Sequence, residues 1–425
     1  MTYKKRNYPP HWELKKMPQV VKWGSGGTPK STESTYYENG TIPWLIIGDL
    51  NDGIVTTSQK KITKLGLDNS SAKMIPAGTL LVAMYGSIGK LGITGIECCT
   101  NQAIAYAKEL YNVKTKYMYY FMALIKPDLI SMGKGDTQKN ISQTVLNSLY
   151  VPVPPIPEQE RIVAHIEELF SELDAGVETL KKTKAQLDVY RQAVLKEAFE
   201  GKLSSHRKVD LELNWVSNEL IQELPQIPDE WQYIALSNLG DLGRGKSKHR
   251  PRNDFILFED GKYPFIQTGE VKAAYKYITK WSKMYGEIGL NQSKLWKKGT
   301  LCITIAANIA ETAFLDMDAC FPDSVVGFTP SDNINPDYIK YFIDSQRLRL
   351  WNYAPATAQK NINLDTLENL IVPYCAVEEQ KIIVSEIESR LSICNNIEQT
   401  IDATLEQANA LRHSILKEVF EGRTP

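Results

Sequence analysis

The stretch "QKNISQTVLNSLYVPVPPIPEQERIVAHIEELF", which begins at Gln138, decides the fold because the chain contains it twice. The second copy, "QKNINLDTLENLIVPYCAVEEQKIIVSEIESRL", begins at Gln359, 221 residues further on. The register continues without a gap to "RQAVLKEAFEGK" and "RHSILKEVFEGR", and about 25 of 64 aligned positions are identical. A repeat of this length predicts a tandem duplication, in which each half is a globular unit followed by a helical one.

Both copies end in a long amphipathic segment. Its apolar residues recur at spacings of three, four and seven, which is the narrow stripe of a coiled coil. We predict that helix pairing uses Ile162, Ile166, Leu169, Leu173, Leu180, Leu187, Ile387, Leu391, Ile401, Leu405 and Leu411. Because such a stripe needs a partner, we expect the two helices to pair with each other. In the alternative, each helix covers the core of its own globular unit.

The globular units combine short β-like runs, such as "GTLLVAMYG" and "GTLCITIAA", with a Tyr-rich helix that follows in each copy. This pattern predicts α+β domains. The expected fold is a tandem duplication of a globular α/β domain plus a long helix, with the two helices forming an antiparallel coiled coil of pseudo-two-fold symmetry. We place the first domain at 1–155, a central helical region at 156–203, a linker and the second domain at 204–376, and a C-terminal helical region at 377–425.

The net charge of −1 conceals an uneven distribution of charge. Residues 156–201 hold 10 acidic and 6 basic side chains, and residues 376–421 hold 9 and 4. These two segments together carry −9, which leaves +8 on the rest of the chain. Basic globular units attract phosphate backbones by Coulomb forces and counterion release, so the charge favours a nucleic-acid partner.

The segment "GDLGRGKS", Gly240 to Ser247, matches the letters of a phosphate-binding P-loop. A working P-loop lies between a buried strand and a helix that begins at once. The next residues, "KHRPRNDF", contain Pro251 and predict a loop. The equivalent stretch of the first copy, "VVKWGSGGTPK", has no Gly-Lys-Ser/Thr. The sequence therefore argues against a nucleotide-hydrolysing enzyme.

No motif predicts an active site. The chain has no HExxH or GxSxG motif, and "NYPPHW" holds the letters of a DNA-methyltransferase loop in the wrong order. The six cysteines lack CxxC spacing and do not cluster with the five histidines, so we expect neither a metal site nor a disulfide framework. The sequence lacks a signal-peptide pattern and an apolar run long enough to span a membrane, which predicts a cytoplasmic protein.

Two kinds of segment are candidates for nucleic-acid contact. Basic side chains gather in a run from Arg244 to Arg252, in a smaller run from Lys60 to Lys64, and between the aromatics of "AAYKYITKWSKMYG". Such residues bind phosphates and stack on bases, although each also fits an ordinary solvated surface. The two "QKN" stretches carry Gln and Asn, which read adenine, and Lys, which binds phosphate or guanine. Their other interpretation is a structural turn before the segment that leads to the long helix.

These motifs, in this order, resemble the specificity (S) subunits of type I restriction–modification systems. The likeness rests on "GGTPK", "YGSIGK", "TQKNIS", "VPVPPIPEQERIV" and "RQAVLKEAFEGKL" and covers nearly the whole chain. The second copy departs from the pattern with "VPYCAVEEQK" and "GRGKSKHRP". These departures put in doubt an identical starting angle for the two helices and an equivalent role for the two loops.

The resemblance implies a non-catalytic subunit, in which each target-recognition domain reads one half of a split DNA sequence and the paired helices set the unread spacer. It implies that two methyltransferase (M) subunits and restriction (R) subunits are partners. S-adenosylmethionine, ATP and magnesium are then expected on those partners, with no cofactor in this chain. The alternative function is a duplicated scaffold or decoy that binds methyltransferase subunits without reading DNA.

The candidate DNA-binding residues lie in the motif loops and basic runs of both copies. They are Thr28, Lys30, Tyr85, Ser87, Lys90, Gln138, Lys139, Asn140, Arg244, Lys246, Lys248, Arg250, Arg252, Asn308, Gln359, Lys360 and Asn361.

Overall fold

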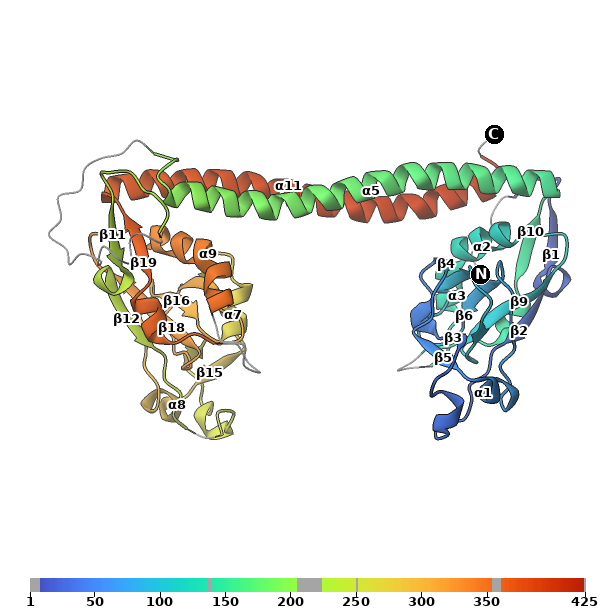
Figure 1. Cartoon of the computed structure of the whole chain (residues 1–425), viewed down its shortest axis with the longest axis horizontal. Helices are drawn as coiled ribbons and strands as arrows, with labels where there is room; N and C mark the ends of the chain where they lie inside the picture. The colour runs from blue at the N-terminus through green and yellow to red at the C-terminus, as the bar shows by residue number, and fades with distance from the viewer. Residues whose placement is uncertain (1–7, 136–138, 205–223, 250, 354–360, 424–425) are drawn as a thin grey trace. The chain divides into compact units, whose positions relative to one another are not determined.

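The computed structural model describes residues 8–135, 139–204, 224–249, 251–353 and 361–423. The chain divides into two compact units. Unit 1 comprises Met1–Lys181 and Asp402–Pro425, and unit 2 comprises Lys182–Ile401. Each unit therefore combines one globular domain with a stretch of each long helix (Figure 1).

The globular domain of unit 1 is built around a five-stranded sheet. Its strands are β1 (Glu13–Lys16), β2 (Val21–Ser25), β3 (Ile42–Leu45), β4 (Gly53–Val55), β5 (Lys60–Ile62), β6 (Leu80–Ala83), β7 (Leu91–Thr94), β8 (Cys99–Thr100), β9 (Ile104–Leu110) and β10 (Tyr150–Val153). Its helices are α1 (Lys64–Asp68), α2 (Thr115–Leu124), α3 (Lys126–Ser131) and α4 (Gln143–Asn147). The large sheet has the order β2-β9-β6-β7-β4, a second sheet has the order β5-β3-β8, and β1 pairs with β10.

The globular domain of unit 2 repeats this plan. Its strands are β11 (Gln232–Ala235), β12 (Gly240–Arg244), β13 (Tyr263–Phe265), β14 (Tyr277–Ile278), β15 (Lys283–Tyr285), β16 (Leu301–Thr304), β17 (Thr312–Leu315), β18 (Val325–Pro330) and β19 (Ile371–Tyr374). Its helices are α7 (Thr268–Ala273), α8 (Glu287–Asn291), α9 (Pro336–Tyr353) and α10 (Leu364–Glu368). The sheets have the orders β12-β18-β16-β17-β14, β13-β15 and β11-β19, so the strand order of the five-stranded sheet of unit 1 recurs. The predicted duplication is confirmed.

The two long helices, α5 (Ile156–Phe199) and α11 (Val377–Phe420), lie alongside each other in each unit (Figure 1). In unit 2, Glu398 pairs with Lys184 at 3.4 Å and with Arg191 at 2.7 Å. Further along α5, Glu197 pairs with Arg390 at 3.6 Å. The partner's number on α11 falls as the number on α5 rises, so the helices run antiparallel, as predicted.

The residues predicted for helix pairing are buried (Ile162, Ile166, Leu187, Ile387, Ile401) or half-buried (Leu169, Leu173, Leu180, Leu391, Leu405), with one exception. Ile162, Ile166 and Ile387 belong to the cores that the helix ends share with the globular domains. Leu411, however, is 48% exposed, and the prediction for it is wrong. Arg412 occupies the helix contact instead, because its guanidinium lies 5.0 Å from the centre of the Phe170 ring and pairs with Asp174.

The C-terminal end of each helix packs on the globular domain of the other copy. Phe420 of α11 is fully buried in unit 1, with its ring centre 5.2 Å from that of Tyr117 on α2. Phe199 of α5 lies 5.0 Å from Tyr338 on α9 in unit 2. Ile166, near the start of α5, is buried in the core of its own copy. Each helix thus begins on its own domain and ends on the other, which excludes the alternative in which a helix covers its own core alone.

The Gln of the "EQ" pair at the start of each long helix connects that helix to the globular domain by hydrogen bonds. The side chain of Gln159 is fully buried, and its oxygen accepts the N–H of Lys114 at 2.9 Å. Its amide group donates to the carbonyls of Asn112 and Pro154, both at 2.9 Å. Gln380 makes two of the corresponding bonds in unit 2, since it accepts the N–H of Asn335 and donates to the carbonyl of Cys375, both at 2.8 Å. A buried amide satisfied in this way fixes the helix start against the segment that leads into the Tyr-rich helix.

Among the described residues, no helix is both long and apolar enough to cross a bilayer. All six cysteines are buried and free. Burial raises the pKa of Cys98 and of Cys99 to about 12, so both thiols stay protonated at neutral pH.

Candidate nucleic-acid interface

One edge of the five-stranded sheet collects the candidate loops in each unit. In unit 1, β2 and β6 both run antiparallel to β9, so the ends of β2 and β6 meet the start of β9. β7 runs antiparallel to β6 and therefore begins at the same edge. In unit 2, β12, β16, β17 and β18 have the same relations. We call this edge, with the loops that leave and enter it, the loop edge.

Backbone hydrogen bonds hold the loops of unit 1 together at the loop edge. The N–H of Gly27 donates to the carbonyl of Thr100 at 2.8 Å, which brings "GGTPK" against the turn before β9. The N–H of Gly86 donates to the carbonyl of Lys139 at 3.1 Å, and Tyr85 pairs with Asn140 as an isolated bridge. The structure thus joins "YGSIGK" to the "QKN" segment, which are far apart in the sequence.

Unit 2 repeats these contacts. The N–H of Lys246 donates to the carbonyl of Phe321 at 3.1 Å, as that of Gly27 does to Thr100, and the N–H of Ile362 donates to the carbonyl of Ile305 at 2.9 Å. Ala306 pairs with Asn361 as Tyr85 does with Asn140. The turn interpretation of "QKN" is therefore supported by the backbone, although the side chains of Asn140 and Asn361 are both exposed.

Most of the described candidates expose their side chains at the loop edge. The exposed residues are Thr28, Lys30, Tyr85, Ser87, Lys139, Asn140, Arg244, Lys246, Lys248, Arg252 and Asn361, and the half-buried ones are Lys90 and Asn308. Gln138, Arg250, Gln359 and Lys360 lie outside the described residues.

The candidate lysines at the loop edge differ in whether a protein group pairs with their positive charge. Lys30 pairs with Glu33 at 3.2 Å, and the ammonium of Lys90 donates to a backbone carbonyl at 3.4 Å. Lys246 and Lys248 form no ion pair with any described residue.

In unit 2, two arginines converge on one residue that sequence reasoning missed. Arg244 donates to the carbonyl of Asp323 at 2.5 Å, and Arg252 pairs with its carboxylate at 2.8 Å. The equivalent residue in unit 1, Gln102, accepts a hydrogen bond from the hydroxyl of Thr28. The 221-residue register identifies Asp323 and Gln102 as equivalent residues but does not predict their contacts.

The turn after β6 in unit 1 and the equivalent turn after β16 in unit 2 have the same backbone shape but different residues. Gly86 and Gly89 have φ of 64° and 73°. Their equivalents, Ala307 and Ala310, have φ of 63° and 59°. The left-handed region is free for glycine but strained for alanine. Unit 2 therefore keeps the shape of this loop at a cost in conformational energy.

The geometry of "GRGKS" differs from that of a P-loop. The backbone N–H groups of Gly245, Lys246 and Lys248 are already bound by protein oxygen atoms at 2.6–3.1 Å. Among the described residues, the next helical element is a single 3₁₀ turn at Phe255–Leu257. The amides and the helix start that would surround a phosphate are therefore not available at this loop.

The first part of the aromatic and basic segment "AAYKYITKWSKMYG", with Tyr275 and Lys276, does not gather at the loop edge. Its Tyr275 hydroxyl accepts a hydrogen bond from Asn395 of α11 at 2.9 Å. Its Lys276 pairs with Glu388 of α11 and with Asp337, both at 2.8 Å. Burial lowers the pKa of Lys276, but the hydrogen bonds to the two carboxylates outweigh it and raise the pKa above its usual value. Tyr275 and Lys276 therefore tie the globular domain of unit 2 to α11.

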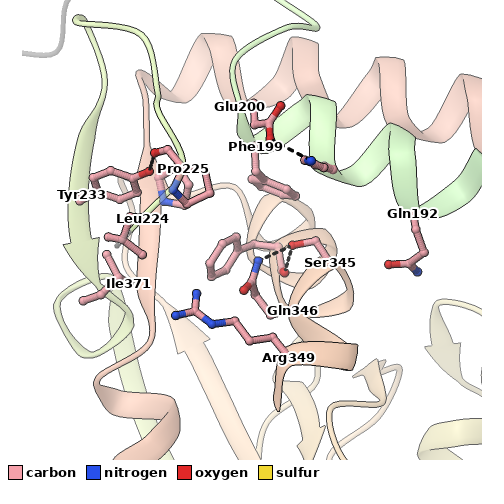
Figure 2. A pocket seen from close by; sticks show the side chains of 13 residues that line it. Gln192, Phe199, Glu200, Leu224, Pro225, Tyr233, Ser345, Gln346, Arg349 and Ile371 are labelled. Atoms are coloured by element: carbon pink, nitrogen blue, oxygen red, sulfur yellow. Dashed lines mark hydrogen bonds and ion pairs between the residues drawn. The ribbon is translucent and has the colours of Figure 1, made fainter. Parts of the chain in front are cut away.

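A cavity of about 270 Å³ lies where the end of α5, α9 and the β11–β19 pair meet (Figure 2). Its wall is mainly apolar, with Phe199, Leu224 and Ile371, and Arg349 extends toward it from α9 (Figure 2). None of its lining residues belongs to the loop edge. Among the described residues, no group of three or more His, Cys, Asp or Glu is arranged to hold a metal ion.

Comparison with known proteins identifies the family to which the chain belongs. The family model described as "Type I restriction modification DNA specificity domain" matches it twice, over residues 9–187 and 228–407. The chain is 25% identical over 390 residues to the type I restriction enzyme EcoBI specificity subunit of Escherichia coli, covering 87% of this chain and 80% of that protein. It is 22% identical over 439 residues to the EcoKI specificity subunit of Escherichia coli strain K12, covering 97% and 89%.

Solved structures share the fold. One chain, from work titled "Structural basis underlying complex assembly and conformational transition of the type I R-M system", matches with a TM-score of 0.72 and 17% identity, covering 97% of this chain and 98% of that chain. The HsdS subunit from Thermoanaerobacter tengcongensis matches with a TM-score of 0.56 and 17% identity over 100% of both chains.

Proposed function

Because the chain belongs to the family of type I restriction–modification DNA specificity proteins, we propose that it is the non-catalytic subunit that reads the DNA target of such a complex. One observation carries the proposal. In each unit, loops from distant parts of the sequence meet at one edge of the five-stranded sheet and expose polar, basic and aromatic side chains there. Side chains of this kind, held on a rigid sheet, suit contact with phosphates and base edges.

The target of this subunit is bipartite and asymmetric. Equivalent positions of the two loop edges carry different side chains: Ser87 corresponds to Asn308, and Lys90 corresponds to Glu311. Hydrogen-bonding groups that differ at the same place read different bases. Each loop edge is therefore assigned to one half-site.

The paired helices set the length of the unread spacer. Two antiparallel helices that each begin on one domain and end on the other support this role. Insertion of one heptad in both helices adds roughly 10 Å, at 1.5 Å per residue, and keeps the pairing stripe in register. We expect the insertion to change the spacer and leave both half-sites unaltered.

The catalytic partners are two methyltransferase subunits and, in the full complex, restriction subunits. S-adenosylmethionine, ATP and magnesium are assigned to those partners. The curated relatives support this assignment because they are named as specificity subunits of type I restriction enzymes.

The test selects bound sequences from a random DNA pool with the complete methyltransferase complex. Ser87→Ala is expected to relax one half of the selected motif and Asn308→Ala the other half, because the two residues occupy equivalent positions and present different hydrogen-bonding groups. If both substitutions alter the same half, or neither alters any base, the assignment of loop edges to half-sites is wrong. If the assembled complex selects no motif, the chain is a scaffold or decoy.

A further inference from the structure

A lysine occupies the same register position beside the loop edge in both units. In unit 1, Lys60 of β5 lies opposite Trp44 of β3. In unit 2, Lys283 of β15 lies opposite Phe265 of β13. The lysines are thus equivalent although they are separated by 223 residues and the surrounding loops differ in length and sequence.

An acidic residue fixes the start of each lysine strand by hydrogen bonds. In unit 1, the carboxylate of Asp49 accepts the N–H of Ile46 at 2.8 Å and the N–H of Gln59 at 2.9 Å. In unit 2, the carboxylate of Glu270 accepts the N–H of Gln267 at 3.1 Å and the hydroxyl of Ser282 at 2.7 Å.

Gln59 and Ser282 directly precede the two lysines. The hydrogen bonds of Asp49 and Glu270 therefore hold the residue next to each lysine and fix the position of the lysine backbone.

Both lysines belong to the surroundings of the loop edge. Lys283 lines a cavity of about 270 Å³ together with Arg252 and Ser324 of that edge. On the unit 1 side, the indole N–H of Trp44, opposite Lys60, donates to the carbonyl of Gly27 at 2.9 Å. Gly27 directly precedes the candidate Thr28.

Neither lysine forms an ion pair with a described residue. Lys60 is exposed, and the ammonium of Lys283 lies 5.4 Å from the centre of the Phe258 ring. A positive charge that the protein does not neutralise attracts an external anion. At the edge of a surface that reads DNA, the anion within reach is a backbone phosphate.

We propose that Lys60 and Lys283 are phosphate clamps, each of which binds one backbone phosphate in the same place relative to its half-site. The inference rests on the proposed function. A phosphate contact carries no sequence information and fixes only the register of the protein on the duplex. This explains why the lysine is the same in both units while the side chains that face the bases differ.

The test measures the affinity of the methyltransferase complex for its specific duplex over a range of salt concentrations. Each neutralised phosphate contributes about 0.9 to the slope of log K against log salt. Lys60→Gln and Lys283→Gln are each expected to lower the slope by about 0.9, and the double variant by about twice that amount. Between about 50 and 200 mM salt, the affinity ratio of wild type to single variant then falls about 3.5-fold.

Matched controls use lysines at the opposite end of the sheets. Lys108→Gln on β9 and Lys297→Gln before β16 each remove one positive charge from an exposed position and are expected to leave the slope near that of wild type. Lys297, unlike the two clamps, pairs with an acidic residue, Asp318, at 2.8 Å. Lys60→Arg and Lys283→Arg are expected to restore it. The selected motif is expected to be unchanged in every variant.

Two outcomes would contradict the phosphate clamps, and a third would contradict the proposed function on which they rest. A wild-type slope in both glutamine variants removes the clamps but leaves the proposed function intact. A changed motif makes the lysines base readers, which also contradicts the inference. If the wild-type complex binds no duplex in preference to another, the proposed function itself fails.

Discussion

Phe420→Ala is expected to loosen the globular domain formed by the first half of the sequence, although the residue lies only three positions before the last one described. The Phe420 side chain is fully buried, and its ring centre lies 5.2 Å from Tyr117 and 5.9 Å from Phe121. Replacing a buried Phe by Ala costs about 3–5 kcal/mol, because both burial and packing contacts are lost. At about 1.4 kcal/mol per factor of ten, local opening becomes at least about 100-fold more frequent.

Hydrogen–deuterium exchange of the full chain, followed by peptide, measures this opening directly. Phe420→Ala is expected to speed exchange in α2 and leave α9 at the wild-type rate. Phe199→Ala is expected to do the reverse, because Phe199 packs on Tyr338 and Phe342 of α9. Leu411→Ala, at an exposed position of the same helix, serves as the control and should change neither. The reasoning is refuted if Phe420→Ala speeds exchange in α9 or leaves α2 unchanged.

Three further predictions concern stability. Gln159→Leu is expected to cost about 1–3 kcal/mol in urea unfolding, since buried backbone groups lose their partners; the exposed Gln186→Leu is the control, and equal losses would contradict a structural role. Ala307→Gly and Ala310→Gly are each expected to raise the free energy of unfolding by about 1 kcal/mol by relieving positive φ, and a lower melting temperature would count against that strain. Hydrogen bonds from Arg191 and Lys184 lower the pKa of Glu398 in the folded protein, so its stabilising effect is present above the unfolded pKa of about 4.3 and lost as the pH falls through the folded value. The stability gap between wild type and Glu398→Gln should therefore shrink on acidification, and a gap independent of pH would disprove the coupling.

The long helices and their antiparallel pairing could be predicted from the sequence. Apolar residues at spacings of three and four indicate a helix, and its apolar stripe has to pack against a partner. The error at Leu411 shows the limit of that argument. After Ala408, a step of three leads to Leu411 and a step of four leads to Arg412. The choice depends on Phe170 and Asp174 of the facing helix, which receive the guanidinium. Periodicity within one helix contains no information about these partners.

The loop edge could be predicted only in part. The motif loops were recognisable from the repeat, but their meeting place depends on which strands pair with β9 and β18. The partners of the candidate cations were also hidden, since Asp323 lies 71 residues beyond Arg252 in the sequence. Contacts over such separations arise from tertiary structure, which local propensity does not encode.

The central claim, that this chain reads a split DNA sequence for a methyltransferase, is tested most directly by mapping methylated adenines across the genome. The comparison is between cells that carry this gene with its partner methyltransferase gene and cells that lack this gene alone. The account predicts an asymmetric motif of two half-sites with a fixed spacer, present in the first cells and lost in the second. Methylation that is the same in both, with the methyltransferase active, would contradict it.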